Sequence, residues 1–394
     1  LMRSSAACDV YKRQGNNNMK KHLSSAPSIR VRRRRGHAPS ERKTAIAAIL
    51  VICAVIIAVS AALCCKAGFP ACSAQRTPPP QNTFVPTSAL LSTAAPLPTS
   101  APLPTAAPLP TATPAPYTFV SVSVSDAAEG QLALVNFEHG FPAADSTDVV
   151  PVTAAGSLLT ERNDLSLAQP ALSALSALAE AFSEQTGGDR LLLTSAYRTL
   201  EYQQGVYDDY AAAYGQAAAD AYVAAPGTSE HHTGLAADLS SMSKDGERVT
   251  LPNHPQFEWL KVHCADYGFI LRYPPEKENI THVAYEPWHF RYIGKENAAA
   301  VRALGITFEE YIEYLRGFTP ETKLLHVPSL SAAKPEDLGS AEFSALPDSG
   351  YVIYFVPTDE NAGTESVNIP VPAQCGSYFI SGSNDGGFIV TAEL

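Results

Sequence analysis

The spacing of hydrophobic positions changes several times along the chain, and each change predicts a different kind of segment. Residues 45–65 (AIAAILVICAVIIAVSAALCC) run for 21 positions without a charge. As a helix rising 1.5 Å per residue, this stretch would reach about 31 Å and cross a bilayer. Residues 73–116 repeat the unit APLPT in a background of Pro, Thr, Ala and Ser, which predicts an extended linker because proline sustains neither helices nor sheet ladders.

From about residue 117 the pattern becomes that of a folded domain. Residues 170–185 place large apolar side chains on one helical face and are followed by Gly187 as a stop signal. Thr307 and Glu310 match a capping box at the start of a later helix. Short runs typical of strands lie between the helical patterns, at 117–125, 132–137, 190–198, 268–273 and 288–293. Because helices of unequal length separate these strands, we expect an α+β fold.

The end of the chain changes character again. Four short β-rich runs are separated by turn signals, at 351–357, 366–372, 377–382 and 387–394. They predict a small β accessory region to which no motif assigns a role. The patterns divide the chain into a basic tail (1–43), a membrane helix (44–66), a linker (67–116), the main folded domain (117–324) and the β-rich region (325–394).

Charge is distributed unevenly and sets the expected topology. Residues 1–43 hold twelve Lys and Arg but only two acidic residues, so the remaining residues must carry −21 to reach the total of −11. This acidity argues against a nucleic-acid partner for the folded part. Seven of these basic residues, between positions 30 and 43, lie just before the apolar segment, so the positive-inside rule predicts a single-pass cell-membrane protein with a cytoplasmic N-terminus and an extracellular folded part. A cleaved signal peptide is the alternative, but its apolar region is usually only about 7–15 residues long.

Two segments combine the residue types that bind metals. SEHHTGLAAD (229–238) offers His231 and Asp238, and YEPWHF (285–290) offers Glu286 and His289. Two imidazoles and one carboxylate are a ligand set that leaves a fourth position on zinc open for water. Glu286 would then serve as a base that takes a proton from that water. Since Pro287 disfavours helical geometry for the residue before it, we expect this pair beside a strand.

A third segment, SAYRTLEYQ (195–203), places Arg198 directly after a predicted buried strand. A guanidinium there could pair bidentately with a substrate carboxylate. An internal salt bridge is the alternative, and the spacing by itself leaves both open. The cysteines are less informative, because only three of the seven would lie outside the membrane and an odd number does not support a disulfide framework.

These segments carry a family resemblance. SAYRTLEYQ, SEHHTGLAAD, GFILRYP and EPWHFRYIG, in this order and at these separations, resemble the VanY-type zinc D-alanyl-D-alanine carboxypeptidases. The family pattern S-x-H-x-x-G-x-A-x-D is matched by Ser229, His231, Gly234, Ala236 and Asp238. The likeness covers roughly residues 130–295 and implies the DD-peptidase/hedgehog-like fold, a small antiparallel sheet flanked by helices.

The resemblance implies three metal ligands for one zinc ion, His231, Asp238 and His289. It implies Glu286 as catalytic base, Arg198 as anchor for the terminal carboxylate of a peptidoglycan stem peptide, and Ser229 and Gln203 as residues lining the substrate cleft. The chain departs from the family at Ala196, Thr199 and His232, where glycine, serine and glutamine are usual. We expect His232 to face solvent, because adjacent residues on an extended segment point opposite ways.

The features together predict a membrane-anchored, extracellular zinc carboxypeptidase that removes the terminal D-alanine from peptidoglycan stem peptides. An L,D-carboxypeptidase or stem-peptide endopeptidase on the same scaffold is one alternative. A non-catalytic wall-binding ectodomain is another. The ligand set argues against the last, because a binding module would not need Glu286 beside three metal ligands.

Overall fold

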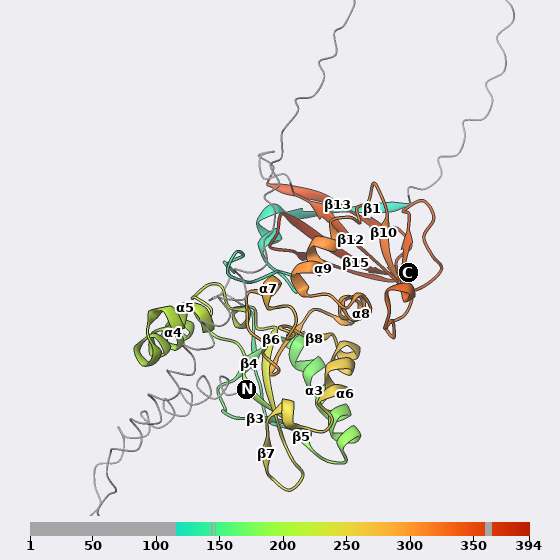
Figure 1. The fold of residues 1–394 in the computed structure, drawn as a ribbon. Coiled ribbons are helices and arrows are strands. Elements are labelled where there is room, and N and C mark those ends of the chain that lie inside the picture. Colours follow the sequence, from blue (N-terminus) through green and yellow to red (C-terminus); the bar gives the residue numbers. More distant parts are fainter. Residues whose placement is uncertain (1–115, 143–144, 146, 359–364) are drawn as a thin grey trace, which may run out of the picture. The chain divides into compact units, whose positions relative to one another are not determined.

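The computed structural model describes residues 116–142, 145, 147–358 and 365–394, which form a mixed α+β arrangement of small sheets and helices (Figure 1). The predicted membrane segment and all of the linker except Pro116 lie outside this part. None of the helices in the described ranges combines the length and the apolarity that crossing a bilayer requires.

A six-stranded sheet forms the centre of the first half of the described part, and all of its strands lie between residues 158 and 292 (Figure 1). Its main strands lie in the order β3-β5-β6-β9-β8, and β7 pairs with β6. The strands are β3 (Leu158–Thr160), β5 (Arg190–Ser195), β6 (Ala236–Met242), β7 (Arg248–Val249), β8 (Phe269–Leu271) and β9 (His289–Tyr292). The implied antiparallel sheet is correct for all pairs except β3 and β5, which run parallel. A short antiparallel pair, β2 (Val150–Pro151) with β4 (Ser166–Leu167), lies outside it.

Helix α3 (Gln169–Thr186) contributes much of the core of this half. Its apolar positions recur at helical spacing, so its buried residues share one face: Ala171, Leu175, Leu178, Ala179 and Phe182. The helix ends at Gly187, whose left-handed φ of 72° favours glycine. Both the helix and its stop signal are confirmed. The remaining helices are α4 (Leu200–Tyr214), α5 (Gln216–Tyr222), α6 (Phe257–His263), α7 (Glu278–Thr281), α8 (Lys295–Leu304) and α9 (Phe308–Leu315).

The strand predicted at 132–137 is wrong. Leu132 and Val135 are fully buried, yet the segment is a loop. Its backbone groups find other partners: the Leu132 N–H donates to the Ser381 hydroxyl, and the Ala133 carbonyl accepts from the Arg291 guanidinium. An apolar run without alternation cannot be distinguished from a buried loop whose polar groups are satisfied by side chains.

The four strands predicted in the tail are confirmed. Three of them belong to a five-stranded sheet in the order β11-β10-β12-β15-β14, with bounds β10 (Leu324–Val327), β11 (Gly339–Ala341), β12 (Tyr351–Pro357), β14 (Ser377–Gly382) and β15 (Gly387–Glu393). The fourth, β13 (Ser366–Pro372), pairs antiparallel with β1 (Tyr117–Ser123). The strand that follows the predicted linker, β1, is therefore hydrogen-bonded to a strand of the β-rich tail.

Helices α8 and α9 share one hydrophobic core with this second sheet. The predicted capping box is confirmed at the start of α9, where the Thr307 hydroxyl accepts from the Glu310 N–H and the Glu310 carboxylate accepts from the Thr307 N–H. This cap fixes where α9 begins. It thereby sets the position of Glu309, which contacts the site described next.

Candidate metal centre

His231 lies on a short turn that the sequence shapes in two ways. The 3-10 helix η3 (Glu230–Thr233) ends at Gly234, whose φ is 67°. A side chain at this glycine would place its Cβ 2.8 Å from Val149 and 3.1 Å from the backbone N of Ala168, so only glycine fits. On this turn the His231 Nδ1 lies 2.7 Å from the Ala196 carbonyl oxygen, which orients Nε2 toward Asp238.

Asp238 and His289 face each other on neighbouring strands. They are register partners between β6 and β9, and the His289 Nδ1 lies 3.0 Å from Asp238 Oδ1. The other oxygen, Oδ2, lies 3.4 Å from the His231 Nε2. Segments 51 residues apart in the chain therefore place His289 and Asp238 at one point of the sheet.

The three side chains fit a small divalent cation. His231, Asp238 and His289 each offer one ligand atom, and these atoms all lie within 4.8 Å of one another. Bonds of about 2.0–2.2 Å to zinc place tetrahedral ligands roughly 3.3–3.5 Å apart, close to the contacts around Asp238. Burial lowers the pKa of His231 to about 4, so its imidazole is neutral and can act as a ligand at neutral pH.

The electrostatics of the cluster change once a cation binds. Burial alone would lower the pKa of His289, but hydrogen bonds to Asp238 and Glu230 overcome this and raise it to about 9 in the metal-free protein. Burial likewise opposes ionisation of Asp238, yet the two histidines hold the pKa of this carboxyl well below its usual range. A cation at this point would take the place of the proton on His289.

Glu286 immediately precedes the turn into β9, as its following proline predicts. Its Oε2 lies 3.8 Å from the His289 Nδ1, beside the cluster rather than within it. Burial raises the pKa of Glu286 to about 7. A carboxyl group with this pKa can both accept and return a proton near neutral pH, as a general acid-base residue must.

Arg198 also contacts Asp238, and its Nη2 is 3.3 Å from Asp238 Oδ2. Two of its nitrogens donate to the Ser195 hydroxyl at 2.9 and 3.1 Å, and Nη1 donates to Gln203 Oε1 at 3.1 Å. Gln203 is buried and donates in turn to the Ala224 carbonyl at 2.7 Å. Arg198 therefore forms an internal salt bridge with Asp238 and also lies beside the metal cluster. Gln203 contacts Arg198 directly.

Ser229 immediately precedes η3, close to His231 in the chain. Its side chain is largely buried, and its hydroxyl has no hydrogen-bond partner within the described part of the chain. The hydroxyl can therefore both donate to and accept from a bound molecule.

The expectation that His232 faces solvent is wrong. Residues 230–233 form a 3-10 helix rather than an extended segment, so neighbouring side chains do not alternate. The His232 ring is fully buried, with Nδ1 2.7 Å from the Arg198 carbonyl oxygen and Nε2 3.0 Å from the Gly227 backbone N. Burial lowers the pKa of His232, which keeps the ring neutral so that it can donate with one nitrogen and accept with the other.

Replacing His232 by alanine should therefore lower the free energy of unfolding by about 1–3 kcal/mol, because the Arg198 carbonyl and the Gly227 N–H both lose a buried partner. Chemical denaturation of the purified protein measures this change. The His232→Gln variant is the control, since an amide also donates and accepts, and it should retain most of the stability. Equal losses in the two variants would contradict a hydrogen-bonding role.

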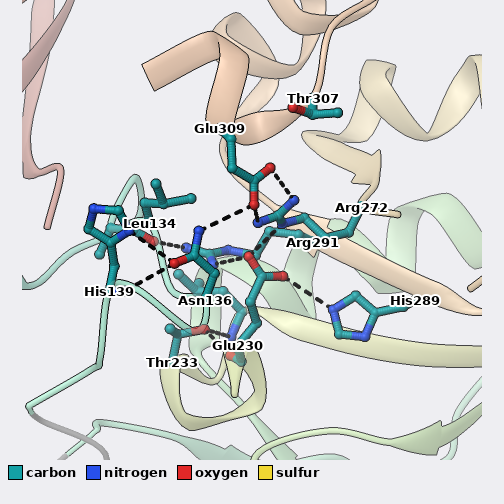
Figure 2. Close-up of polar contacts among 12 residues, drawn as sticks. Leu134, Asn136, His139, Glu230, Thr233, Arg272, His289, Arg291, Thr307 and Glu309 are labelled. Carbon is teal, nitrogen blue, oxygen red and sulfur yellow. Dashed lines mark hydrogen bonds and ion pairs between the residues drawn. The ribbon is translucent and has the colours of Figure 1, made fainter. Parts of the chain in front are cut away.

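A buried ion cluster of Glu230, Glu309, Arg272 and Arg291 lies next to His289 and was not predicted from the sequence (Figure 2). Glu230 Oε1 accepts from Arg272 Nε at 2.8 Å and from Arg291 Nη1 at 2.9 Å, while its Oε2 lies 3.2 Å from His289 Nε2. Arg272 also donates two hydrogen bonds to Glu309 on α9, at 2.5 and 2.7 Å. Arg272 lies in the GFILRYP segment and Arg291 in the EPWHFRYIG segment. An arginine within each of these two predicted strands was the available signal of buried acidic partners.

Comparisons with known proteins agree with this site. A family model described as "VanY: D-alanyl-D-alanine carboxypeptidase" matches residues 164–295. A D-alanyl-D-alanine carboxypeptidase of Enterococcus faecalis is 36% identical over 196 residues, covering 48% of this chain and 67% of the relative. Another from Enterococcus faecium is 28% identical over 278 residues, covering 69% of this chain and 78% of the relative.

Among solved structures, the vancomycin-resistance D,D-dipeptidase VanXYg in complex with a D-Ala-D-Ala phosphinate analogue matches with a TM-score of 0.57 at 28% identity. The match covers 71% of this chain and 99% of that one. An α+β fold that joins two histidines, a carboxylate and an adjacent glutamate defines the protein as a hydrolase of the metallopeptidase class. The chain belongs to the VanY family of D-alanyl-D-alanine carboxypeptidases.

Proposed function

We propose that the protein is a zinc-dependent D-alanyl-D-alanine carboxypeptidase that removes the terminal D-alanine from peptidoglycan stem peptides. The observation that carries this proposal is the convergence of three metal-ligand side chains, His231, Asp238 and His289, with Glu286 beside His289 and Arg198 beside Asp238. Relatives described as D-alanyl-D-alanine carboxypeptidases support the same substrate class.

His231, Asp238 and His289 would hold one zinc ion, because their donor types and spacing suit it. The bound ion would polarise the scissile carbonyl and lower the pKa of water at the site. The chain supplies the rest of the site. Two imidazole nitrogens and one carboxylate are three protein ligands, which leave the fourth position on zinc open for water, as in catalytic zinc sites.

Arg198 would pair with the terminal carboxylate of the peptide and so select chain ends. The Ser229 hydroxyl would bind the backbone of the bound peptide. Glu286 would take a proton from the attacking water and return it to the leaving amine, a role that suits a carboxyl with a pKa of about 7. Positioning of the peptide by Arg198 would hold the scissile bond near Glu286.

Incubation of the purified full chain with pentapeptide and tetrapeptide stems, followed by mass analysis of the products, tests the proposal. We expect loss of one D-alanine from the pentapeptide, loss of that activity on treatment with a chelator, and recovery on addition of zinc. Cleavage of the tetrapeptide alone would assign the L,D-carboxypeptidase activity instead. Absence of cleavage by the zinc-loaded protein would favour the wall-binding alternative.

We further propose that residues 44–66 anchor the protein in the cell membrane with residues 67–394 outside the cell. The uncharged stretch at 45–65 and the basic residues before it support this topology. Protease treatment of intact cells tests it. Residues 117–394 should be accessible to the protease and residues 1–43 protected, and the reverse pattern would overturn the proposal.

A further inference from the structure

We propose that Glu230 is a positioning residue of the metal centre, which holds the Nε2–H of His289 and thereby keeps the Nδ1 lone pair directed at the metal. The inference rests on the proposed function, because it requires a cation beside His231, Asp238 and His289. Glu230 itself touches neither the substrate nor the cation. It acts only through the imidazole of His289.

The geometry places one carboxylate at each nitrogen of the His289 ring. Nδ1 lies 3.0 Å from Asp238 Oδ1 and Nε2 lies 3.2 Å from Glu230 Oε2. A neutral imidazole carries a single N–H, and an ionised carboxylate can only accept a hydrogen bond. Because Asp238 belongs to the cation site and the buried Glu230 does not, the proton is most stable on Nε2, and Nδ1 is left to bind the cation.

The two carboxylate oxygens of Glu230 have different hydrogen-bond partners. Oε1 accepts from both buried guanidinium groups, Arg272 and Arg291, at 2.8 and 2.9 Å. This leaves Oε2 for His289. Two guanidinium groups donating to one carboxylate oxygen pair it with positive charge, so the group is held as a hydrogen-bond acceptor.

The orientation of Glu230 is braced from a distant part of the chain. Arg272 forms a two-point pair with Glu309 of α9 (Figure 2). Arg291 donates to the backbone carbonyls of Gln131 and Ala133. Two glutamates thus balance two arginines, and no member of the cluster can rotate without breaking a buried hydrogen bond. Glu309 thus contacts only Arg272, whereas Glu230 contacts the imidazole of His289 directly.

A purely structural ion pair and a positioning residue predict different results for Glu230→Gln. In this variant the amide oxygen is drawn to the two arginine donors, so its NH₂ group faces the His289 Nε2. That arrangement favours the ring with its proton on Nδ1, the atom that must bind the cation. Glu309→Gln is the matched control, because it also weakens a buried pair with Arg272 but does not touch His289.

Zinc affinity of the full chain, measured by competition with a chromophoric chelator, separates the two roles. We expect Glu230→Gln to weaken zinc binding by about 10- to 100-fold, the usual effect of removing a carboxylate that supports a metal-bound histidine. Glu309→Gln should stay within about threefold of the unmodified protein. Equal affinity for all three proteins, or an equal loss in both variants, would overturn the proposal.

A second measurement needs no variant and covers the case in which Glu230→Gln does not fold. In the zinc-loaded unmodified protein, ¹⁵N NMR of the His289 ring should show a proton on Nε2 and none on Nδ1. A proton on Nδ1 would overturn the inference. Neither readout depends on peptide cleavage, so a protein that binds zinc in this way but leaves stem peptides intact would refute the proposed function and not the role of Glu230.

Discussion

Replacing Glu286 by glutamine should lower kcat on a D-alanyl-D-alanine peptide by about 10²- to 10⁴-fold, the usual contribution of a general acid-base group. The amide keeps the size of the side chain but can no longer take a proton. Because Glu286 lies beside the metal cluster and not within it, zinc content should be unchanged. Steady-state kinetics together with metal analysis of the same sample measure both quantities.

Glu276→Gln is the control for the loss of one negative charge, since this glutamate is exposed and should leave turnover unchanged. A Glu286→Gln protein that retains turnover would remove the residue from the mechanism. One that loses its zinc as well would instead make Glu286 part of the metal site. Either result would revise the roles inferred from the 3.8 Å separation between Glu286 and His289.

Replacing Arg198 by alanine should reduce kcat/KM on the same peptide by about 10²-fold or more, because a half-buried partner for the substrate carboxylate is lost. The comparison that isolates this role uses a peptide with an amidated C-terminus. The unmodified enzyme should cleave the amide poorly, and Arg198→Ala should cleave the two peptides at similar rates.

Arg198 also contacts Asp238, so metal content must be measured alongside the rates. If zinc is lost together with activity, the salt bridge to Asp238 accounts for the effect. If Arg198→Ala still prefers the free carboxylate by the same factor as the unmodified enzyme, the arginine does not bind it. Arg198→Lys gives a further test, because an ammonium group keeps the charge but not the two-pronged geometry.

The sequence predicted those parts of the fold whose signals are local. The amphipathic pattern and Gly187 defined α3, and alternating runs between turn residues defined the strands of the tail. The loop at 132–137 was missed because its backbone is satisfied by side chains far away in the chain, among them Ser381 at a separation of 249 residues. A pattern read in a short window cannot contain that information.

The site residues likewise divide into those with a local sequence signal and those defined by contacts far apart in the chain. His231, Asp238, Glu286 and His289 were recognisable from their residue types and spacing, and the structure brings them together. Glu230 was not recognisable. Its partners Arg272 and Arg291 lie 42 and 61 residues away, and a glutamate next to two histidines looks in sequence like an ordinary polar turn residue. The prediction for His232 was wrong because the extended backbone on which it depended is a 3-10 helix in the structure.

The pairing of β1 with β13 determines how a mechanical load would enter the protein. Tension applied from the N-terminal side reaches the folded part at Tyr117, which is in register with Pro372 in the seven-residue ladder. The force is therefore taken up first by the hydrogen bonds of this ribbon and by the region to which β13 belongs. The strands that carry Asp238 and His289 pair in a different sheet, so a force applied at Tyr117 would have to separate β1 from β13 before it deformed the site.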